Sequence, residues 1–288
     1  MAIQHFILGV SVMLWGLAAG SGYADTPLLK HIRGEAVQGG LLIYQTSPDA
    51  QIFIDGEQRA VSANGFFPIA FHRDDEATVT LELRLAGQPP LVEKITPRSR
   101  SYEIERIDGL ARQMVTPDKE VLSRITADRE DVYLARHQHS ETEDALISGF
   151  SWPATGRITG IYGAQRILNG KPRQPHYGID IALPTGAAIA ASADGIVTMA
   201  QDLYFTGGTI IIDHGFGLST TYSHLEQMIV RPSQQVKRGQ IIGTAGSTGR
   251  STGPHLDWRV NLGNQRLDPA LVSAAPDIPG PKPRPSLF

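Results

Sequence analysis

Five side chains in the second half of the chain have types and spacings that could support metal binding or proton transfer. They are His176, Asp180, His224, His255 and Asp257. The chain has no cysteine, so any bound metal must be held by histidine nitrogen or carboxylate oxygen. Imidazole also gains and loses a proton near neutral pH, which suits it to acid–base chemistry. The group therefore predicts a metal site, a proton-transfer site, or a site that combines the two.

The elements that must position these residues are short strands. Residues 251–260 read STGPHLDWRV, and an extended backbone places alternate side chains on opposite faces. One face then consists of core residues, whereas the other carries His255, Asp257 and Arg259. This polar face fits a functional site, and it equally fits the solvent-exposed face of an edge strand.

The pair His176 and Asp180 needs a bend to act together. On an extended strand, residues four apart share a face but lie about 13 Å from one another, too far to bind one ion. Gly178 lies between them and supplies the backbone freedom for such a bend. Taken alone, the pair also fits a turn in which Asp180 only has a capping role.

The remaining histidines give weaker indications. His214 lies between Asp213 and Gly215, and these neighbours predict a turn between two strands. His137 and His139 imitate a metal-binding pair, but side chains two residues apart on a helix point away from each other. We therefore expect these histidines to have no metal role.

Length, charge and hydropathy limit the class of protein. The 288 residues suggest about two domains at roughly 150 residues each. A net charge of −3 gives no reason to expect nucleic acid binding, which normally uses a basic surface. An apolar run over residues 6–20 precedes small residues up to Ala24, so residues 1–24 are predicted to be a cleaved export signal. No later stretch is long and apolar enough to span a membrane after that cleavage.

The pattern of the chain predicts an all-β protein in which a helical segment separates two β-rich parts. Residues 25–110 alternate between short strands and hairpin turns, which predicts a small β-sandwich-like accessory domain. Residues 111–147 predict a helical linker with a helix over residues 116–137. Glycine-broken strands predict a second β domain over residues 148–275, and residues 276–288 read as a proline-rich tail.

In chain order the candidate residues form the pattern His-x3-Asp, Tyr-Ser-His and Gly-Pro-His-x-Asp. Here the chain resembles the LytM- and lysostaphin-type metallopeptidases of family M23, in the exported Gram-negative form that carries an extra β domain in front. The resemblance covers about residues 150–272 and includes the segments GRITGIYGAQRILNG, PHYGIDIALPTGAAIAASADGIVTMA, VKRGQIIGTAGSTG and TGPHLDWRV. It implies a LytM-type antiparallel β-sheet or hybrid-barrel fold for residues 148–275.

The resemblance also implies a function, which is hydrolysis of peptide cross-links in peptidoglycan with one zinc ion. His176 and Asp180 would be zinc ligands. His255 would take a proton from the attacking water and His224 would stabilise the oxyanion, or the two roles would be exchanged. The resemblance further implies a periplasmic location in a Gram-negative envelope, with peptidoglycan as the partner and other cell-wall or division proteins as further candidates.

The chain departs from the family pattern at one metal position. The usual ending is His-x-His, in which the second histidine is the third zinc ligand, but Asp257 occupies that place here. Carboxylate oxygen binds zinc at similar distances, so a His-Asp-Asp set predicts weak zinc binding, or a preference for another divalent metal, with slow hydrolysis. The alternative is a degenerate LytM-type domain without metal that binds and activates another wall hydrolase. The other four residues are present and Asp257 is itself a ligand type, which favours the enzyme.

Overall fold

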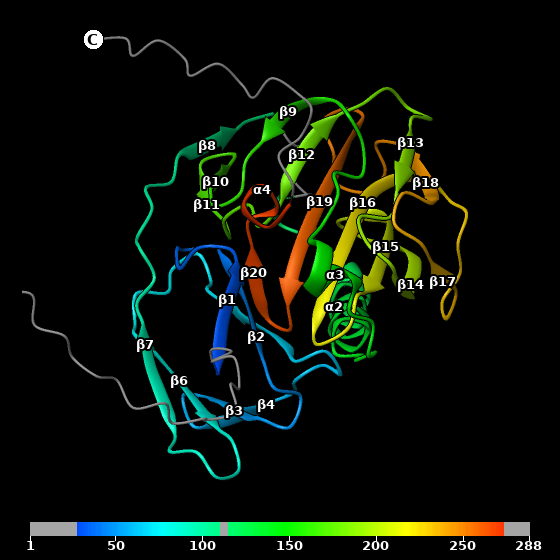
Figure 1. Ribbon diagram of the computed structural model, residues 1–288. Coiled ribbons are helices and arrows are strands. Elements are labelled where there is room, and N and C mark those ends of the chain that lie inside the picture. The colour runs from blue at the N-terminus through cyan, green and yellow to red at the C-terminus, as the bar shows by residue number, and fades with distance from the viewer. Residues whose placement is uncertain (1–27, 110–114, 274–288) are drawn as a thin grey trace, which may run out of the picture.

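The computed structural model describes residues 28–109 and 115–273, and its first part consists of two small β-sheets (Figure 1). The first sheet has the order β1-β2-β5, formed by β1 (Leu29–Arg33), β2 (Leu41–Thr46) and β5 (Phe66–Ala70). The second has the order β4-β3-β6-β7, formed by β4 (Glu57–Arg59), β3 (Gln51–Ile54), β6 (Val79–Arg84) and β7 (Leu91–Ile95). The predicted signal peptide and proline-rich tail lie outside the described residues.

Alternation along the strands explains why these two sheets pack together. In β6, Leu81 and Leu83 are buried, whereas Thr80 and Glu82 beside them are more accessible. The two leucines share one core with residues from both sheets, namely Leu42, Tyr44, Ile52, Phe67 and Ile69. The arrangement is sandwich-like, as the alternation and hairpin turns predict.

The first sheet is also buried on its other face. Leu41 and Ile43 of β2 belong to the main core of the protein, together with Leu146 and Phe150. The first sheet and the large C-terminal sheet are therefore joined through packed side chains and not only through a linker.

Among its described residues, the connection between the two β-rich parts contains helices α2 and α3, whose bounds follow. A 3₁₀ turn, η1 (Lys119–Val121), leads directly into α2 (Leu122–Arg136), and α3 (Asp144–Ser148) follows. The predicted start at residue 116 was wrong, because Asp118 has an extended backbone and separates Pro117 from the first helical turn. Helix α2 packs on the large sheet through a small cluster formed by Val132, Ala135, Met199, Leu203 and Ile211.

The large C-terminal sheet carries the predicted site residues. Its main path has the order β17-β14-β15-β16-β19-β12-β9, and neighbouring strands along it are antiparallel. The strands are β17 (Gln235–Val236), β14 (Gly195–Leu203), β15 (Gly207–Asp213), β16 (Leu218–Met228), β19 (His255–Leu262), β12 (Ile179–Ala182) and β9 (Arg157–Gly160). Branches of the sheet are β13 (Ala188–Ala190), β18 (Ile241–Ala245) and β20 (Gln265–Leu267), and the short helix α4 (Pro269–Val272) follows β20. This fold confirms the prediction of a mostly β, antiparallel C-terminal domain.

One strand from the front of the chain pairs with the C-terminal part. β8 (Ile104–Ile107) lies parallel to β10 (Gln165–Leu168), which also pairs with β11 (Lys171–Pro172). This parallel pair departs from the antiparallel pattern elsewhere. It places residues of β8 next to the site described below. None of the helices in the described residues is long and apolar enough to span a membrane.

His214 lies in the turn between β15 and β16, as its neighbours predict, but its ring is fully buried. Nδ1 pairs with the carbonyl of Asp194 at 2.8 Å and Nε2 with the hydroxyl of Thr220 at 2.7 Å. Burial lowers the pKa of His214 to about 4, because the charged ring cannot be solvated there. The histidine therefore supports the fold in its neutral form.

We expect this burial to make the fold sensitive to acid. Below the ordinary histidine pKa of about 6.5 the unfolded chain binds a proton at His214 that the folded chain rejects, so stability falls as the pH falls. Between pH 7 and pH 5 the unfolding free energy of the wild type should lose about 2 kcal/mol relative to His214→Gln, measured by urea denaturation. A difference that stays constant over this range would contradict the assignment.

Candidate metal and catalytic site

The candidate site begins with the pairing of β12 and β19, whose register sets Asp180 directly opposite Asp257. Directly opposed residues in an antiparallel pair place their side chains on the same face, about 5 Å apart. β19 lies between β16 and β12, and Asp257 is only 2% exposed. The polar face of β19 is therefore an interior site. The alternative, that it is the solvent-exposed face of an edge strand, was wrong.

His176 joins the two carboxylates through the bend that its spacing from Asp180 requires. The chain before β12 is irregular, and the backbone N–H of His176 is bonded to the carbonyl of Ala164 at 2.9 Å. Gly178 lies so close to β19 that a Cβ atom there would come within 2.7 Å of Oδ1 of Asp257 and of the carbonyl of Trp258. Only glycine allows this approach, which brings a histidine from outside the strand over the carboxylate pair.

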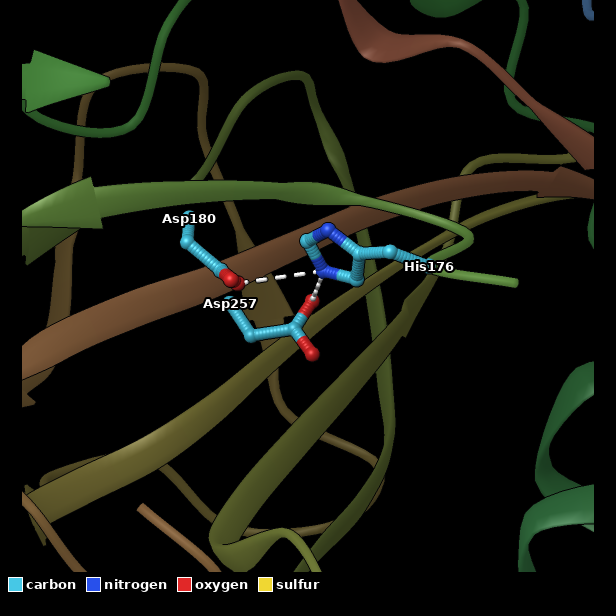
Figure 2. A group of neighbouring side chains, drawn as sticks. All are labelled: His176, Asp180 and Asp257. Carbon is cyan, nitrogen blue, oxygen red and sulfur yellow. Dashed lines mark ion pairs between the residues drawn. The ribbon is translucent and has the colours of Figure 1, made fainter. Parts of the chain in front are cut away.

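The three side chains converge, as Figure 2 shows. Nε2 of His176 lies 3.1 Å from Oδ1 of Asp180 and 3.6 Å from Oδ1 of Asp257. One potential ligand atom from each residue lies within 4.8 Å of the other two, and all three residues are buried. The structure thus brings together the three residues that the sequence predicts as metal ligands.

The hydrogen bonding of this cluster fits a metal-binding group. In the described residues, both ring nitrogens of His176 and Oδ1 of Asp180 are buried without a hydrogen-bond partner. Buried polar atoms in proteins are normally satisfied, so Nε2 of His176 and Oδ1 of Asp180, which meet at 3.1 Å, call for a further partner. One nitrogen and two carboxylate oxygens form a donor set that suits zinc and other divalent ions.

The charges of the cluster are strongly coupled. Burial would lower the pKa of His176, but the carboxylates of Asp180 and Asp257 outweigh it and raise that pKa above its ordinary value. Burial would likewise raise the pKa of Asp257, but the Arg259 guanidinium and His176 hold it well below its usual range. Both carboxylates are therefore ionised at neutral pH, which is the state that binds a cation.

Two arginines that are not among the predicted site residues pair with these carboxylates. Arg259 donates from Nε to Oδ1 of Asp257 at 2.9 Å and from Nη2 to Oδ2 of the same residue. Arg166 of β10 donates to Oδ2 of Asp180 at 3.0 Å, and it also pairs with Glu105 of β8. Each arginine orients its carboxylate, and each competes with a cation for the negative charge.

The Arg259 pair could have been predicted, because residues two apart on a strand share a face. The Arg166 pair could not, because it depends on how distant segments pack.

The two remaining histidines lie next to this cluster. The ring centroids of His224 and His255 are 4.6 Å apart, and Nε2 of His255 lies 3.9 Å from Oδ1 of Asp180. Nδ1 of His224 pairs with the carbonyl of Thr248 and Nδ1 of His255 with that of Gly253, each at 2.8 Å. Because a carbonyl only accepts, each Nδ1 carries a proton and each neutral ring keeps its lone pair on Nε2.

His224 reaches this position through an unusual backbone. Simple alternation along β16 would place it on the same face as Tyr222, which is buried in the core. His224 instead has a φ of 64° in the left-handed region, and its side chain lines the same cleft as His255. Non-glycine residues adopt this conformation rarely, and such residues often occur at functional sites.

The cluster opens into a cleft of about 360 Å³. Its walls come from strands of the large sheet, from β8 and β10, and from the loop before β19. The lining includes Asp180, Asp257, His224 and His255, so the carboxylates and imidazoles face a common space that is open to a ligand.

Comparison with known proteins identifies the class of this domain. The fold superimposes on the crystal structure of a putative peptidase M23 from Pseudomonas aeruginosa with a TM-score of 0.65 at 27% identity, covering 83% of this chain and 95% of that one. Residues 174–269 match the family model described as Peptidase family M23. The C-terminal part of the chain is therefore a peptidase family M23 domain with a LytM-type fold, as the sequence resemblance implies.

Curated relatives carry this domain in longer chains. The chain is 32% identical over 192 residues to the peptidoglycan DD-endopeptidase ShyA of Vibrio cholerae, a match that covers 65% of this chain and 40% of ShyA. It is 36% identical over 127 residues to ShyB of the same organism, covering 43% of this chain and 26% of ShyB. The DD-carboxypeptidase/endopeptidase Mpg of Neisseria meningitidis is 40% identical over 98 residues, covering 34% of this chain and 23% of Mpg. The chain thus spans less than half the length of each of these relatives.

Proposed function

We propose that this protein is a metal-dependent endopeptidase that hydrolyses peptide cross-links in peptidoglycan. The observation that carries the proposal is the convergence of three buried donors, His176, Asp180 and Asp257, beside two imidazoles in one cleft. The names of ShyA, ShyB and Mpg support peptidoglycan as the substrate and D,D-cross-links as the bond class.

In this proposal His176, Asp180 and Asp257 hold one divalent ion, for which zinc is the first candidate. Such an ion supplies Lewis-acid polarisation of the scissile carbonyl and favours ionisation of a water molecule. Arg166 and Arg259 orient the two carboxylates but neutralise part of their charge. We therefore expect zinc to bind more weakly than it would to a site with a second histidine in place of Asp257.

The two histidines supply acid–base chemistry. Burial lowers the pKa of His224, and Asp257 only partly offsets this effect, so the ring is neutral at neutral pH and its Nε2 can accept a proton from the attacking water. His255 would have the other role: its Nε2 lies 3.9 Å from Oδ1 of Asp180, at the edge of the proposed ion site, where it can interact with the oxyanion. The lowered pKa of His224 favours the exchanged assignment, with His224 as the base, over the one with His255 as base.

Alanine at either histidine is expected to lower turnover by about 100-fold or more, because each removes a proton-transfer or oxyanion contact. Metal content should not change, since neither residue belongs to the proposed ligand set. The measurement is kcat on cross-linked muropeptides together with bound metal per chain. Loss of metal from His255→Ala would make His255 a ligand and reject the assignment.

The proposal places the protein in the periplasm of a Gram-negative envelope, where its substrate lies. Residues 1–24 would be the export signal, residues 25–110 an accessory β domain, residues 111–147 the linker and residues 148–275 the peptidase domain. Other cell-wall or division proteins remain candidate partners of the accessory part.

One specific contact, the ion pair between Asp257 and Arg259, supports a second candidate function. Asp257 accepts hydrogen bonds from Nε and Nη2 of Arg259, and this ion pair neutralises the third ligand position without a metal. Such a self-neutralised site suits a non-catalytic LytM-type domain that binds and activates another wall hydrolase. The two candidate functions differ in one respect: an endopeptidase cleaves peptidoglycan by itself, whereas an activator needs another hydrolase to do so.

The test is incubation of the purified protein with isolated peptidoglycan, followed by counting of cross-linked muropeptides, with and without a chelator. Loss of cross-links that the chelator prevents supports the endopeptidase. No loss, in buffer that contains zinc at a concentration that saturates the site, would reject it and favour the activator.

A further inference from the structure

The cleft has unbalanced positive charge on the wall formed by β9. The three carboxylates that line the cleft are paired with arginines: Glu105 and Asp180 with Arg166, and Asp257 with Arg259. Arg157 of β9 also lines the cleft, and it forms no ion pair with any residue in the described part of the chain. Its side chain is exposed, so a ligand in the cleft meets a guanidinium that no carboxylate occupies.

The register of the sheet places Arg157 close to the reacting groups. Ala182 of β12 pairs with Arg157 on one side and with His255 on the other. Neighbouring strands lie about 4.8 Å apart, so the backbones at Arg157 and His255 are about 10 Å apart. An extended peptide advances about 3.4 Å per residue, so a group held by Arg157 would belong to a residue within about three positions of the scissile bond.

A second cation strengthens the positive field in the same cleft. Arg250 lines it from the loop before β19, and its guanidinium lies 4.6 Å from the ring centroid of Phe205. Burial lowers the pKa of Arg250, and the nearby Arg166 and Arg259 lower it further. Because neighbouring cations repel the Arg250 guanidinium, an anion that binds in the cleft stabilises its charge.

We propose that Arg157 binds a free carboxylate of the peptide substrate, close to the bond that is cut. The inference rests on the proposed function, because it assigns a peptide to the cleft. The planar fork of arginine matches the two oxygens of a carboxylate. Thr159 of β9 lines the same cleft, and its hydroxyl donates to the carbonyl of Asp180 at 3.3 Å, so Arg157 is the group of β9 that is left to bind the carboxylate. The site therefore selects acidic peptides over peptides in which that carboxylate is an amide.

Binding to the metal-free protein tests this without relying on turnover. The probes are a soluble cross-linked muropeptide dimer and the same dimer with its carboxylates converted to amides. Titration calorimetry in the presence of chelator should show the wild type binding the acidic form about tenfold more tightly than the amidated form.

Three variants locate the preference. Arg157→Gln should lose it, whereas Arg157→Lys should keep part of it, because lysine retains the charge without the fork. Arg231→Gln is the matched control, since Arg231 is an exposed arginine outside the cleft and its loss changes the net charge equally. Arg231→Gln should keep the full preference.

A wild type that binds both forms equally, or that binds neither, overturns the inference. So does Arg157→Gln with the preference of the wild type. These results are separate from the proposed function. Preference lost in Arg157→Gln without any hydrolysis by the metal-loaded protein rejects only the endopeptidase, whereas hydrolysis without the preference rejects only the carboxylate site.

Discussion

Replacing Asp257 with histidine is expected to tighten zinc binding by about tenfold or more, a gain of at least about 1.4 kcal/mol, and to raise the rate of cross-link hydrolysis. A neutral imidazole leaves more of the ion's charge to polarise the carbonyl than a second carboxylate does. Histidine at this position also cannot form the ion pair with Arg259, so the metal ion no longer competes with a guanidinium for its third ligand. The measurements are zinc affinity against a competing chelator and the initial rate of muropeptide cleavage.

The double variant Asp257→His with Arg259→Gln is the control for charge. In the single variant Arg259 loses its partner and remains a cation beside the site, which reduces the gain in zinc affinity. The affinities should therefore increase from wild type to single variant to double variant. If the wild type binds zinc more tightly than both, Asp257 is an adapted ligand and our account of weak binding is wrong.

Arg259→Gln in the otherwise native chain is expected to have two opposite effects. Zinc affinity should rise by about tenfold, because Asp257 is released from a competing cation in a buried setting. The metal-free protein should lose about 3 kcal/mol of stability, since removing one partner of a buried ion pair leaves a buried charge uncompensated. Added zinc should restore part of this stability, which thermal unfolding with and without zinc measures.

Arg84→Gln is the matched control for Arg259→Gln. Arg84 pairs with Glu82 two residues away on β6, the same strand spacing as the Arg259 and Asp257 pair, but this pair is on the surface and far along the chain from the site. Arg84→Gln should leave the zinc affinity unchanged, and zinc should stabilise this variant as much as it stabilises the wild type. An unchanged zinc affinity in Arg259→Gln would mean that Asp257 does not contact the metal.

Much of the site could be predicted because it depends on local rules. Alternation in β19 places Leu256 and Trp258 in the core and Asp257 on the opposite face, and the structure agrees. A bend between His176 and Asp180 follows from their distance on an extended chain, and the structure places it at Gly178, where the close approach to β19 requires a residue without a Cβ atom. These inferences need only strand geometry and the freedom of glycine.

What could not be predicted depends on contacts between distant segments. Arg166 reaches Asp180 from β10, and Glu105 holds Arg166 only because β8 pairs in parallel with that strand. The left-handed backbone of His224 breaks the alternation that otherwise describes β16 well. No periodicity in the sequence indicates either feature.

The burial of Asp257 likewise could not be predicted from the sequence. The polar face of β19 is covered because the strand is central in the sheet and because the His176 segment crosses it. Only the strand order reveals this. Because the same packing buries the Asp257 carboxylate, leaving it unpaired destabilises the fold. Arg259→Gln is therefore expected to have a large effect on stability.

The most direct test of this account is the amount of zinc bound per chain at equilibrium, measured by dialysis of the purified protein against zinc at a buffered free concentration. His176→Ala, which removes the nitrogen ligand, is dialysed beside the wild type. The account predicts saturation of the wild type at one zinc per chain and loss of that binding in His176→Ala. Wild-type binding no greater than that of His176→Ala would contradict it and leave a LytM-type domain that acts without a metal.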